Sequence, residues 1–337
     1  VLRTKSIQPL TLQMKEGLSL INGCQVMTAV GLMNLYRGRQ LCWLTDLAGA
    51  MSLEALRGTR SAFDPSIAAV RPHHGEAETA RNLLRLLGKT SAIAESHANC
   101  EKVQDAYSLR CMPAVHGAAK NALRQSVHVL EVEANSSTDN PLVFSAENKI
   151  LSCGNFHGEP VAFQLDFAGI AMSAMASISE CRVEKLINPA MSDLPAFLAP
   201  RGGLNSGHMI VQVAAASLVS ENKILAHPAS VDSIPTSADK EDHVSMGTIA
   251  ARKLGQIVDN AENIVAMELL SASQALGFLK PLEPAAGVKV ALDLLRKHVP
   301  FAEEDRVFSE DLGKIRELIQ SEELLKSVNL QVGELEW

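Results

Sequence analysis

The chain has 337 residues, of which 47% are hydrophobic, 20% charged and only 4% aromatic, and its formal net charge is −7. This much apolar material can form a large core, which excludes a mainly disordered chain, and the scarcity of aromatic residues favours helices over a β-sandwich. The acidic balance and the absence of a Lys/Arg-rich block argue against binding to nucleic acid or to an anionic membrane.

The cysteines and the apolar segments of the sequence indicate the cellular compartment in which the chain is found. The six cysteines form no C-x-x-C pair, so we predict no disulfide framework and no metal site, and we expect a reduced, cytoplasmic setting. The most apolar run, residues 167–178, is followed by Glu180 and Arg182 and is too short to span a bilayer. Because the sequence begins with Val1 rather than Met, we expect its translation start to lie elsewhere.

Helical periodicity dominates the chain from its beginning. Residues 10–36 predict a helix that is interrupted at Asn22-Gly23, a pair that favours a turn. Residues 113–134 predict a second helix. Residues 161–187 predict a third, with Phe163, Phe167 and Ile170 on its apolar stripe.

The remaining segments continue this pattern. Residues 206–227 predict a helix that Pro228 ends, and residues 246–272 carry an apolar stripe of about seven turns. Ser245 and Gly277 are the expected caps of that last helix. We therefore predict an all-α fold, a long-helix bundle. Residues 1–300 would form its central part, and the charged residues 301–337 a peripheral helical tail of the same domain.

Polar segments that interrupt the helices are the candidates for a site. In residues 104–110, Arg110 offers a planar fork that suits a carboxylate, and Tyr107 can face the same way on a helical turn. Gln104 precedes them. Spacing alone favours the plainer alternative, a surface arginine beside a packed tyrosine.

Two further polar segments allow more than one interpretation. His157 and Glu159 could be an acid/base pair or metal ligands, but one histidine and one glutamate do not make a metal site, and a structured turn is equally well supported. Residues 236–243 are rich in charge, which by itself favours a solvated loop before a helix. The common motifs for phosphate, dinucleotide, serine-hydrolase and zinc-protease chemistry do not occur.

Taken together and in this order, the segments resemble the histidine ammonia-lyase branch of the aromatic amino acid lyases. The matching stretches are KEGL (15–18), LING (20–23), QDAYSLR (104–110), STDNP (137–141), GNFH (154–157) and EDHVSMG (241–247). The resemblance covers nearly the whole chain and is weakest in the last thirty residues or so. Each stretch alone is unspecific, whereas the ordered set is highly specific.

The resemblance implies a reaction and an assembly. The reaction is the removal of ammonia from L-histidine to give trans-urocanate. The assembly is a homotetramer whose active sites combine residues from three protomers. The resemblance also implies a methylidene-imidazolone electrophile, which the family forms autocatalytically from an internal Ala-Ser-Gly triplet.

Roles for individual residues follow from the same resemblance. Arg110 would clamp the substrate carboxylate, with Gln104 hydrogen-bonding nearby. Asn22 and Tyr107 would line the electrophile and help to orient the carboxylate, and Tyr107 would take part in catalysis. Phe156 would pack against the electrophile and exclude water.

Glu241 would face the imidazole or amino group of the substrate and act in catalysis. Phenylalanine and tyrosine lyases usually carry a glutamine in this region, so Glu241 is the feature that favours histidine. Lys240 stands where the family has a glutamine before this glutamate, and a cation there could pair with Glu241 and weaken its contact with the substrate.

The electrophile is the main departure from the family, because no Ala-Ser-Gly triplet occurs in the chain. The family places this triplet, a catalytic tyrosine and a substrate-binding histidine N-terminal to the segment that matches residues 10–25. We therefore expect the C-terminal part of such a lyase, inactive without the missing upstream segment. The alternatives are a phenylalanine or tyrosine ammonia-lyase, an aminomutase, or a non-catalytic structural or interaction subunit that retains the fold.

Overall fold

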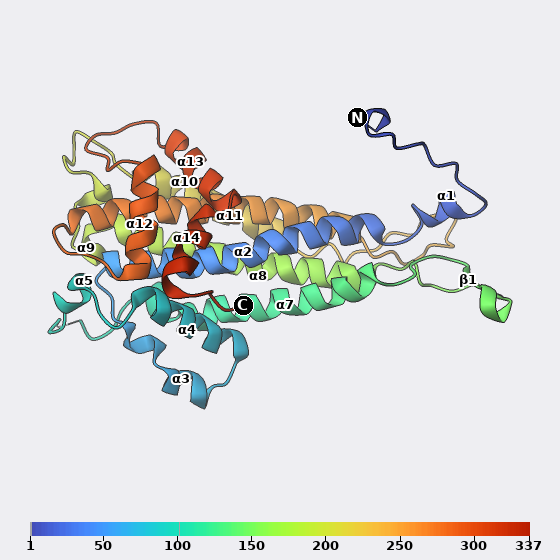
Figure 1. Ribbon diagram of the computed structural model, residues 1–337, viewed down its shortest axis with the longest axis horizontal. Coiled ribbons are helices and arrows are strands. Elements are labelled where there is room, and N and C mark those ends of the chain that lie inside the picture. Colours follow the sequence, from blue (N-terminus) through green and yellow to red (C-terminus); the bar gives the residue numbers. More distant parts are fainter. Residues whose placement is uncertain (1, 101) are drawn as a thin grey trace.

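A computed structural model describes residues 2–100 and 102–337, and it is dominated by long helices (Figure 1). The helices are α1 (Glu16–Ser19), α2 (Gln25–Ala55), α3 (Pro65–Val70), α4 (His74–Leu87), α5 (Ala92–Glu95), α6 (Tyr107–Arg110), α7 (Met112–Ala134), α8 (Glu159–Ile187), α9 (Pro189–Ser192), α10 (Met209–Leu225), α11 (Gly247–Phe278), α12 (Ala286–His298), α13 (Phe308–Gln320) and α14 (Glu323–Val332). One small antiparallel hairpin joins β1 (Leu142–Phe144) to β2 (Lys149–Leu151). The predicted all-α class is confirmed.

Four long helices, α2, α7, α8 and α11, lie side by side and form the core (Figure 1). Helix α8 packs against the other three, and α11 also packs along α2. Their shared interior consists mainly of Leu, Ala, Met and Ile side chains. Helices α12, α13 and α14 cover one side of this bundle near the C-terminus (Figure 1).

The bundle has two ends, which we name for the short helices found there. The α1 end holds α1, the β-hairpin and the loop before α8, and the α6 end holds α5, α6 and α9 (Figure 1). Helix α2 begins at the α1 end, where the Cys24 thiol lies 3.3 Å from the Phe156 carbonyl oxygen. It ends at the α6 end, where the Asp105 carboxylate accepts a hydrogen bond from the Thr59 amide at 2.7 Å.

Most predicted helices are present, with differences at their ends. The segment 113–134 is α7, the segment 161–187 is α8, and the interruption at Asn22-Gly23 separates α1 from α2. The predicted first helix is wrong in extent, because residues 10–13 are not helical and α2 continues to Ala55. Gly277 is not a C-cap. It lies inside α11, where a Cβ would come within 2.5 Å of the Phe301 ring, so the glycine serves close packing.

Helix α8 is longer than its most apolar run suggested. At 29 residues it is long and apolar enough to cross a membrane, judged by length and composition alone. It nevertheless lies in the middle of the bundle and buries Asp166 and Arg182 along its length. These are the features of a core helix. Its stripe is only partly covered in this chain, because Phe163, Phe167 and Ile170 are all about half exposed.

Candidate functional site

At the α6 end, three of the predicted site residues form one cluster. The Arg110 guanidinium donates to the Asp105 carbonyl oxygen at 3.0 Å through Nε and to Gln104 Oε1 at 2.8 Å through Nη2. The same guanidinium lies over the Tyr107 ring, 4.6 Å from its centroid. The prediction that Tyr107 and Arg110 share a face of one helical turn is therefore confirmed.

The positive charge of Arg110 has no acidic partner among the residues that the structure describes. Within residues 2–100 and 102–337, no carboxylate lies within ion-pair distance of its guanidinium. The neighbours that hold it are neutral acceptors and an aromatic face, and they leave N–H groups of the fork available. A restrained but unpaired arginine at the surface is suited to bind a carboxylate supplied from outside the chain.

At the α1 end, Asn22 is positioned by Asp139. The Asn22 amide donates to Asp139 Oδ1 at 3.1 Å, while Ser19 Oγ donates to Oδ2 at 2.7 Å and Lys15 forms an ion pair with the same oxygen. The Lys15 ammonium, above all, holds the pKa of Asp139 well below its usual range. Asp139 belongs to the family-like stretch 137–141, but the sequence alone assigns it no role. The geometry makes it the anion that orients Asn22.

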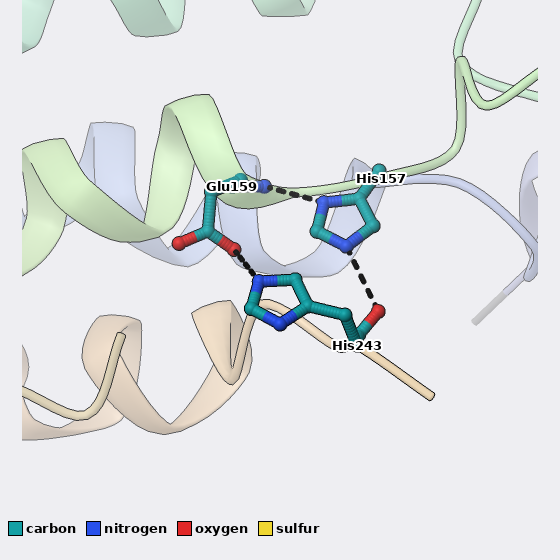
Figure 2. A group of neighbouring side chains, drawn as sticks. All are labelled: His157, Glu159 and His243. Carbon is teal, nitrogen blue, oxygen red and sulfur yellow. Dashed lines mark hydrogen bonds and ion pairs between the residues drawn. The ribbon is translucent and has the colours of Figure 1, made fainter. Parts of the chain in front are cut away.

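Phe156 lies at the same end, just before α8, and its ring is partly exposed. The next residues form a small cluster, in which His157 Nε2 lies 3.1 Å from the His243 carbonyl oxygen and the Glu159 amide donates to His157 Nδ1 at 3.3 Å (Figure 2). His243 Nε2 lies 3.8 Å from Glu159 Oε2, and the two imidazole rings are parallel. The cluster therefore links the loop before α11 to the beginning of α8.

Two histidines and a glutamate are residue types that can bind a metal ion. One ligand atom from each of His157, Glu159 and His243 lies within 4.8 Å of the others. However, Nδ1 of His157 accepts the Glu159 amide, so Nε2 carries the proton and donates to a carbonyl oxygen. Both ring nitrogens are thus engaged within the chain, and a metal ion would have to displace one of these bonds. The arrangement is better suited to fastening the loop than to holding an ion.

Glu241 lies in that same loop and is exposed. Its Oε2 accepts a hydrogen bond from the Thr236 hydroxyl at 2.8 Å, and this bond, together with one from Ser237, lowers the pKa of Glu241 from its ordinary value. The carboxylate is therefore ionised at neutral pH. In the described part of the chain Lys240 forms no ion pair with Glu241, so the pairing considered from the sequence is absent here.

The two groups lie far apart. Asn22, Phe156 and Glu241 belong to the α1 end, whereas Gln104, Tyr107 and Arg110 belong to the α6 end. Helix α2 separates them, and its 31 residues span about 46 Å at 1.5 Å per residue. One chain therefore clusters Gln104, Tyr107 and Arg110 and places the other three residues at the opposite end, but it does not join the two groups into one site.

Comparison with known proteins gives consistent matches. A family model described as aromatic amino acid lyase matches residues 1–297. A histidine ammonia-lyase from Sorangium cellulosum is 53% identical over 335 residues, which are 98% of this chain and 65% of that protein. The crystal structure of histidine ammonia-lyase from Trypanosoma cruzi matches with a TM-score of 0.90 and 46% identity, over 98% of this chain and 62% of that one.

An enzyme of different reaction type has the same fold. Tyrosine aminomutase from Streptomyces globisporus matches with a TM-score of 0.92 and 32% identity, over 99% of this chain and 68% of that one. The chain spans 64–65% of the length of the curated relatives that it matches first.

Proposed function

Because the chain belongs to the aromatic amino acid lyase family, we propose that it forms the C-terminal part of an enzyme that converts L-histidine to trans-urocanate and ammonia. The observation that carries this proposal is the restrained guanidinium of Arg110, which has no acidic partner in the described part of the chain and matches the carboxylate of an amino acid. The histidine ammonia-lyases at about 50% identity support histidine as that amino acid. We also propose a cytoplasmic location.

The substrate's ring and carboxylate would contact different groups. Arg110 would hold the carboxylate with Gln104 beside it, while Glu241, ionised through its hydrogen bonds to Thr236 and Ser237, would face the basic imidazole or the amino group. An anion suits a basic heteroaromatic ring better than it suits a phenyl ring. Glu241 is therefore the residue on which the choice of histidine depends.

The expected electrophile is a methylidene-imidazolone group. When bound, it would supply an electrophilic carbon to the substrate's amino group and so make that amino group a better leaving group. Asn22, Tyr107 and Phe156 would hold the electrophile. They fit this role, because Asp139 holds the amide of Asn22 in place and the rings of Tyr107 and Phe156 are both exposed. Since the triplet from which the group forms does not occur in these 337 residues, we propose that another segment supplies it. Phe156 would exclude water from the reacting carbon.

A complete site would need more than one copy of the chain, because its two halves lie at opposite ends of the bundle. We propose a homotetramer in which the α6 end of one protomer meets the α1 end of another. The half-exposed Phe163, Phe167 and Ile170 on α8 support such an assembly, since apolar side chains of this size are usually covered. Association of copies along the helices would bury them.

The decisive experiment is an assay of urocanate formation, followed by its ultraviolet absorbance, on the protein purified from its native source with its mass measured intact. We expect urocanate and a polypeptide segment that contains Ala-Ser-Gly. Parallel assays with phenylalanine and tyrosine, including a search for β-amino acid products, separate a histidine lyase from other lyases and from aminomutases. A properly assembled protein with the electrophile that turns over none of these substrates would make the chain a structural subunit.

Glu241→Gln tests the choice of histidine. We expect kcat/KM for histidine to fall by about tenfold or more, because the anion that faces the imidazole is lost, while the melting temperature stays unchanged at this exposed position. Asp242→Asn, at the exposed neighbouring residue, is the matched control and should leave kcat/KM within about twofold. If both variants lose the same activity, Glu241 has no specific part in recognition.

A further inference from the structure

A group of buried charged and polar side chains crosses the core close to α6. It comprises Arg182 on α8, Glu268 on α11, His116 on α7 and Asp46 on α2, none of which is exposed to solvent. Burying charge is costly unless each group is paired and hydrogen-bonded. Each of these residues therefore depends on its ion-pair and hydrogen-bond partners.

Arg182 and Glu268 form the central ion pair. Arg182 Nε donates to Glu268 Oε1 at 2.6 Å and Nη2 donates to Oε2 at 2.8 Å, which is the paired geometry that fixes a guanidinium plane. Ser52 and Ser179 also donate their hydroxyls to this carboxylate. Glu268 is thus fully hydrogen-bonded, and it leaves Nη1 of Arg182 directed elsewhere.

His116 is the second support of Arg182. Burial, more than any other cause, lowers the pKa of His116, so its imidazole is neutral. Arg182 Nη1 lies 3.3 Å from His116 Nε2, and a guanidinium can only donate, so Nε2 bears the lone pair and Nδ1 bears the proton. That proton is donated to Asp46 Oδ1 at 2.8 Å. The contacts thus determine the tautomer of the ring.

Asp46 completes the chain of contacts. Its other oxygen accepts Lys120 Nζ at 2.7 Å and Asn82 Nδ2 at 2.9 Å. Burial by itself would raise the pKa of Asp46, but the Lys120 ammonium and the His116 hydrogen bond outweigh it and hold the pKa below its usual value. Two anions and two cations therefore balance around a neutral imidazole, and all four core helices contribute.

The remaining hydrogen bond of Arg182 reaches α6, which is not one of the four core helices. Nη1 also donates to the carbonyl oxygen of Ser108, at 3.3 Å. Ser108 is buried and lies in α6, the four-residue helix that presents Tyr107 and Arg110 on its outer side. A single helical turn is not stable by itself, and only Cys111 separates α6 from α7. The direction in which α6 points is therefore set by this connection together with contacts such as the Arg182–Ser108 hydrogen bond.

From these contacts we infer that Arg182 and His116 are positioning residues, which orient the α6 turn so that Tyr107 and Arg110 are held ready for the substrate carboxylate. The part of this inference that concerns the substrate rests on the proposed function. The part that concerns the orientation of α6 does not, and it can be measured without a substrate.

The test uses Arg182→Lys in the complete protein. A lysine can still neutralise Glu268, but it has no fork with which to contact Glu268, His116 and the Ser108 carbonyl together. We expect hydrogen–deuterium exchange of the backbone amides in residues 108–111 to become about tenfold faster, and KM for histidine to rise by a similar factor with a smaller change in kcat. Exchange in the middle of α8 and α11 should stay slow.

Ser179→Ala is the matched control, because it removes a hydrogen bond to Glu268 but makes no contact with Ser108. It should leave exchange in residues 108–111 within about twofold of the wild type. Equal acceleration in both variants would overturn the inference, since α6 would then respond to general loosening of the core. Unchanged exchange in folded Arg182→Lys protein would overturn it as well.

A second variant covers the case in which Arg182→Lys does not fold. His116→Asn can still donate to Asp46 but is too short to accept from Arg182, and it should accelerate exchange in residues 108–111 in the same way. If exchange rises but the wild-type protein turns over no histidine, the orientation of α6 by Arg182 stands and the proposed function fails. If histidine is turned over but exchange in the variants does not change, the proposed function stands and the orientation of α6 by Arg182 fails.

Discussion

Arg110 combines two properties that a carboxylate-binding arginine needs. Its guanidinium is restrained by Gln104, the Asp105 carbonyl and the Tyr107 ring, so little conformational entropy remains to be lost on binding. It also lacks an acidic partner in the residues that the structure covers, so binding a carboxylate would not require an existing ion pair to break. Arg182 differs in this respect, because its Nε and Nη2 groups already donate to the Glu268 carboxylate.

The substitution Arg110→Lys should raise KM for histidine by about tenfold or more, because a point charge replaces the planar fork and loses the contact with the Tyr107 ring. Steady-state kinetics on the complete enzyme measure the effect. Arg201→Lys is the control, since Arg201 is an exposed arginine paired with Glu304. Unchanged KM in Arg110→Lys would remove Arg110 from carboxylate binding.

Helix packing at the element scale depends on a close crossing between α4 and α7. At Gly117 a Cβ would lie 2.3 Å from the Glu76 backbone nitrogen and 2.5 Å from the Gly75 carbonyl carbon. Backbone atoms of a packed helix cannot move aside as a flexible side chain can. Gly313 in α13 has the opposite surroundings. Apart from its chain neighbours and the backbone of its own helix, no atom of the described residues lies within 4 Å of its Cβ position.

These two glycines make a matched pair. Gly117→Ala should destabilise the protein by about 1–3 kcal/mol or more through overpacking, whereas Gly313→Ala should stabilise it by up to about 1 kcal/mol through higher helix propensity. Thermal or denaturant unfolding of both variants checks the pair. A stabilising Gly117→Ala would show that α4 and α7 do not approach as closely as described.

His208 links three elements and gives the fold a dependence on pH. It precedes α10, its Nδ1 lies 3.0 Å from the Ser271 hydroxyl on α11, and its ring packs against Phe308 on α13. Burial, the largest cause, lowers the pKa of His208 to about 3. An unfolded histidine has a pKa of about 6.5, so between these values the unfolded state binds the extra proton.

Because the unfolded state binds the extra proton, acid lowers the unfolding free energy of the protein. The contribution of His208 to stability is complete above about pH 6.5 and falls as the pH drops towards 3, by about 1.4 kcal/mol per pH unit. His208→Gln can keep the hydrogen bond to Ser271 but does not titrate. Between pH 7 and pH 5 the variant should therefore lose about 2 kcal/mol less of its unfolding free energy than the wild type. Parallel losses in urea titrations would contradict the assignment.

The separation of the two groups of candidate residues is a property of the whole molecule. Helix α2 is 31 residues long and runs from the α1 end to the α6 end of the bundle (Figure 1). Asn22 comes shortly before its first residue, and the 104–110 segment lies near its last. No rotation of a side chain spans the length of α2, about 46 Å. Any site that uses both groups must therefore be shared between copies.

Shared sites allow a complementation test. Two variants, Arg110→Ala and Glu241→Ala, should each be inactive as homo-oligomers of the complete protein. After co-expression or mixing under dissociating conditions, about a quarter of the sites would combine an intact Arg110 with an intact Glu241 from different protomers, and activity should reappear. Mixtures that form hetero-oligomers, as native mass spectrometry can show, yet stay inactive would place both residues in sites within one chain.

Local regularities in the sequence determined the helices. The segments 113–134 and 161–187 correspond to α7 and α8 because an apolar residue every third or fourth position is a property of the segment itself. The motifs 104–110 and 154–157 likewise marked Arg110, Tyr107 and Phe156, and the ordered set of motifs indicated the family. Each of these signals is contained in one short segment of the sequence, so it can be recognised without knowing the fold.

Contacts between distant segments follow from the tertiary structure and not from any local pattern. The tertiary structure placed Asp139 beneath Asn22, joined Arg182 to the Ser108 carbonyl, and showed that Gly277 is a packing residue rather than a cap. These contacts join residues that are widely separated along the chain, and no local pattern records which face of one helix meets another. The separation of the candidate site into two ends has the same origin, because it depends on the length and course of α2 rather than on any motif.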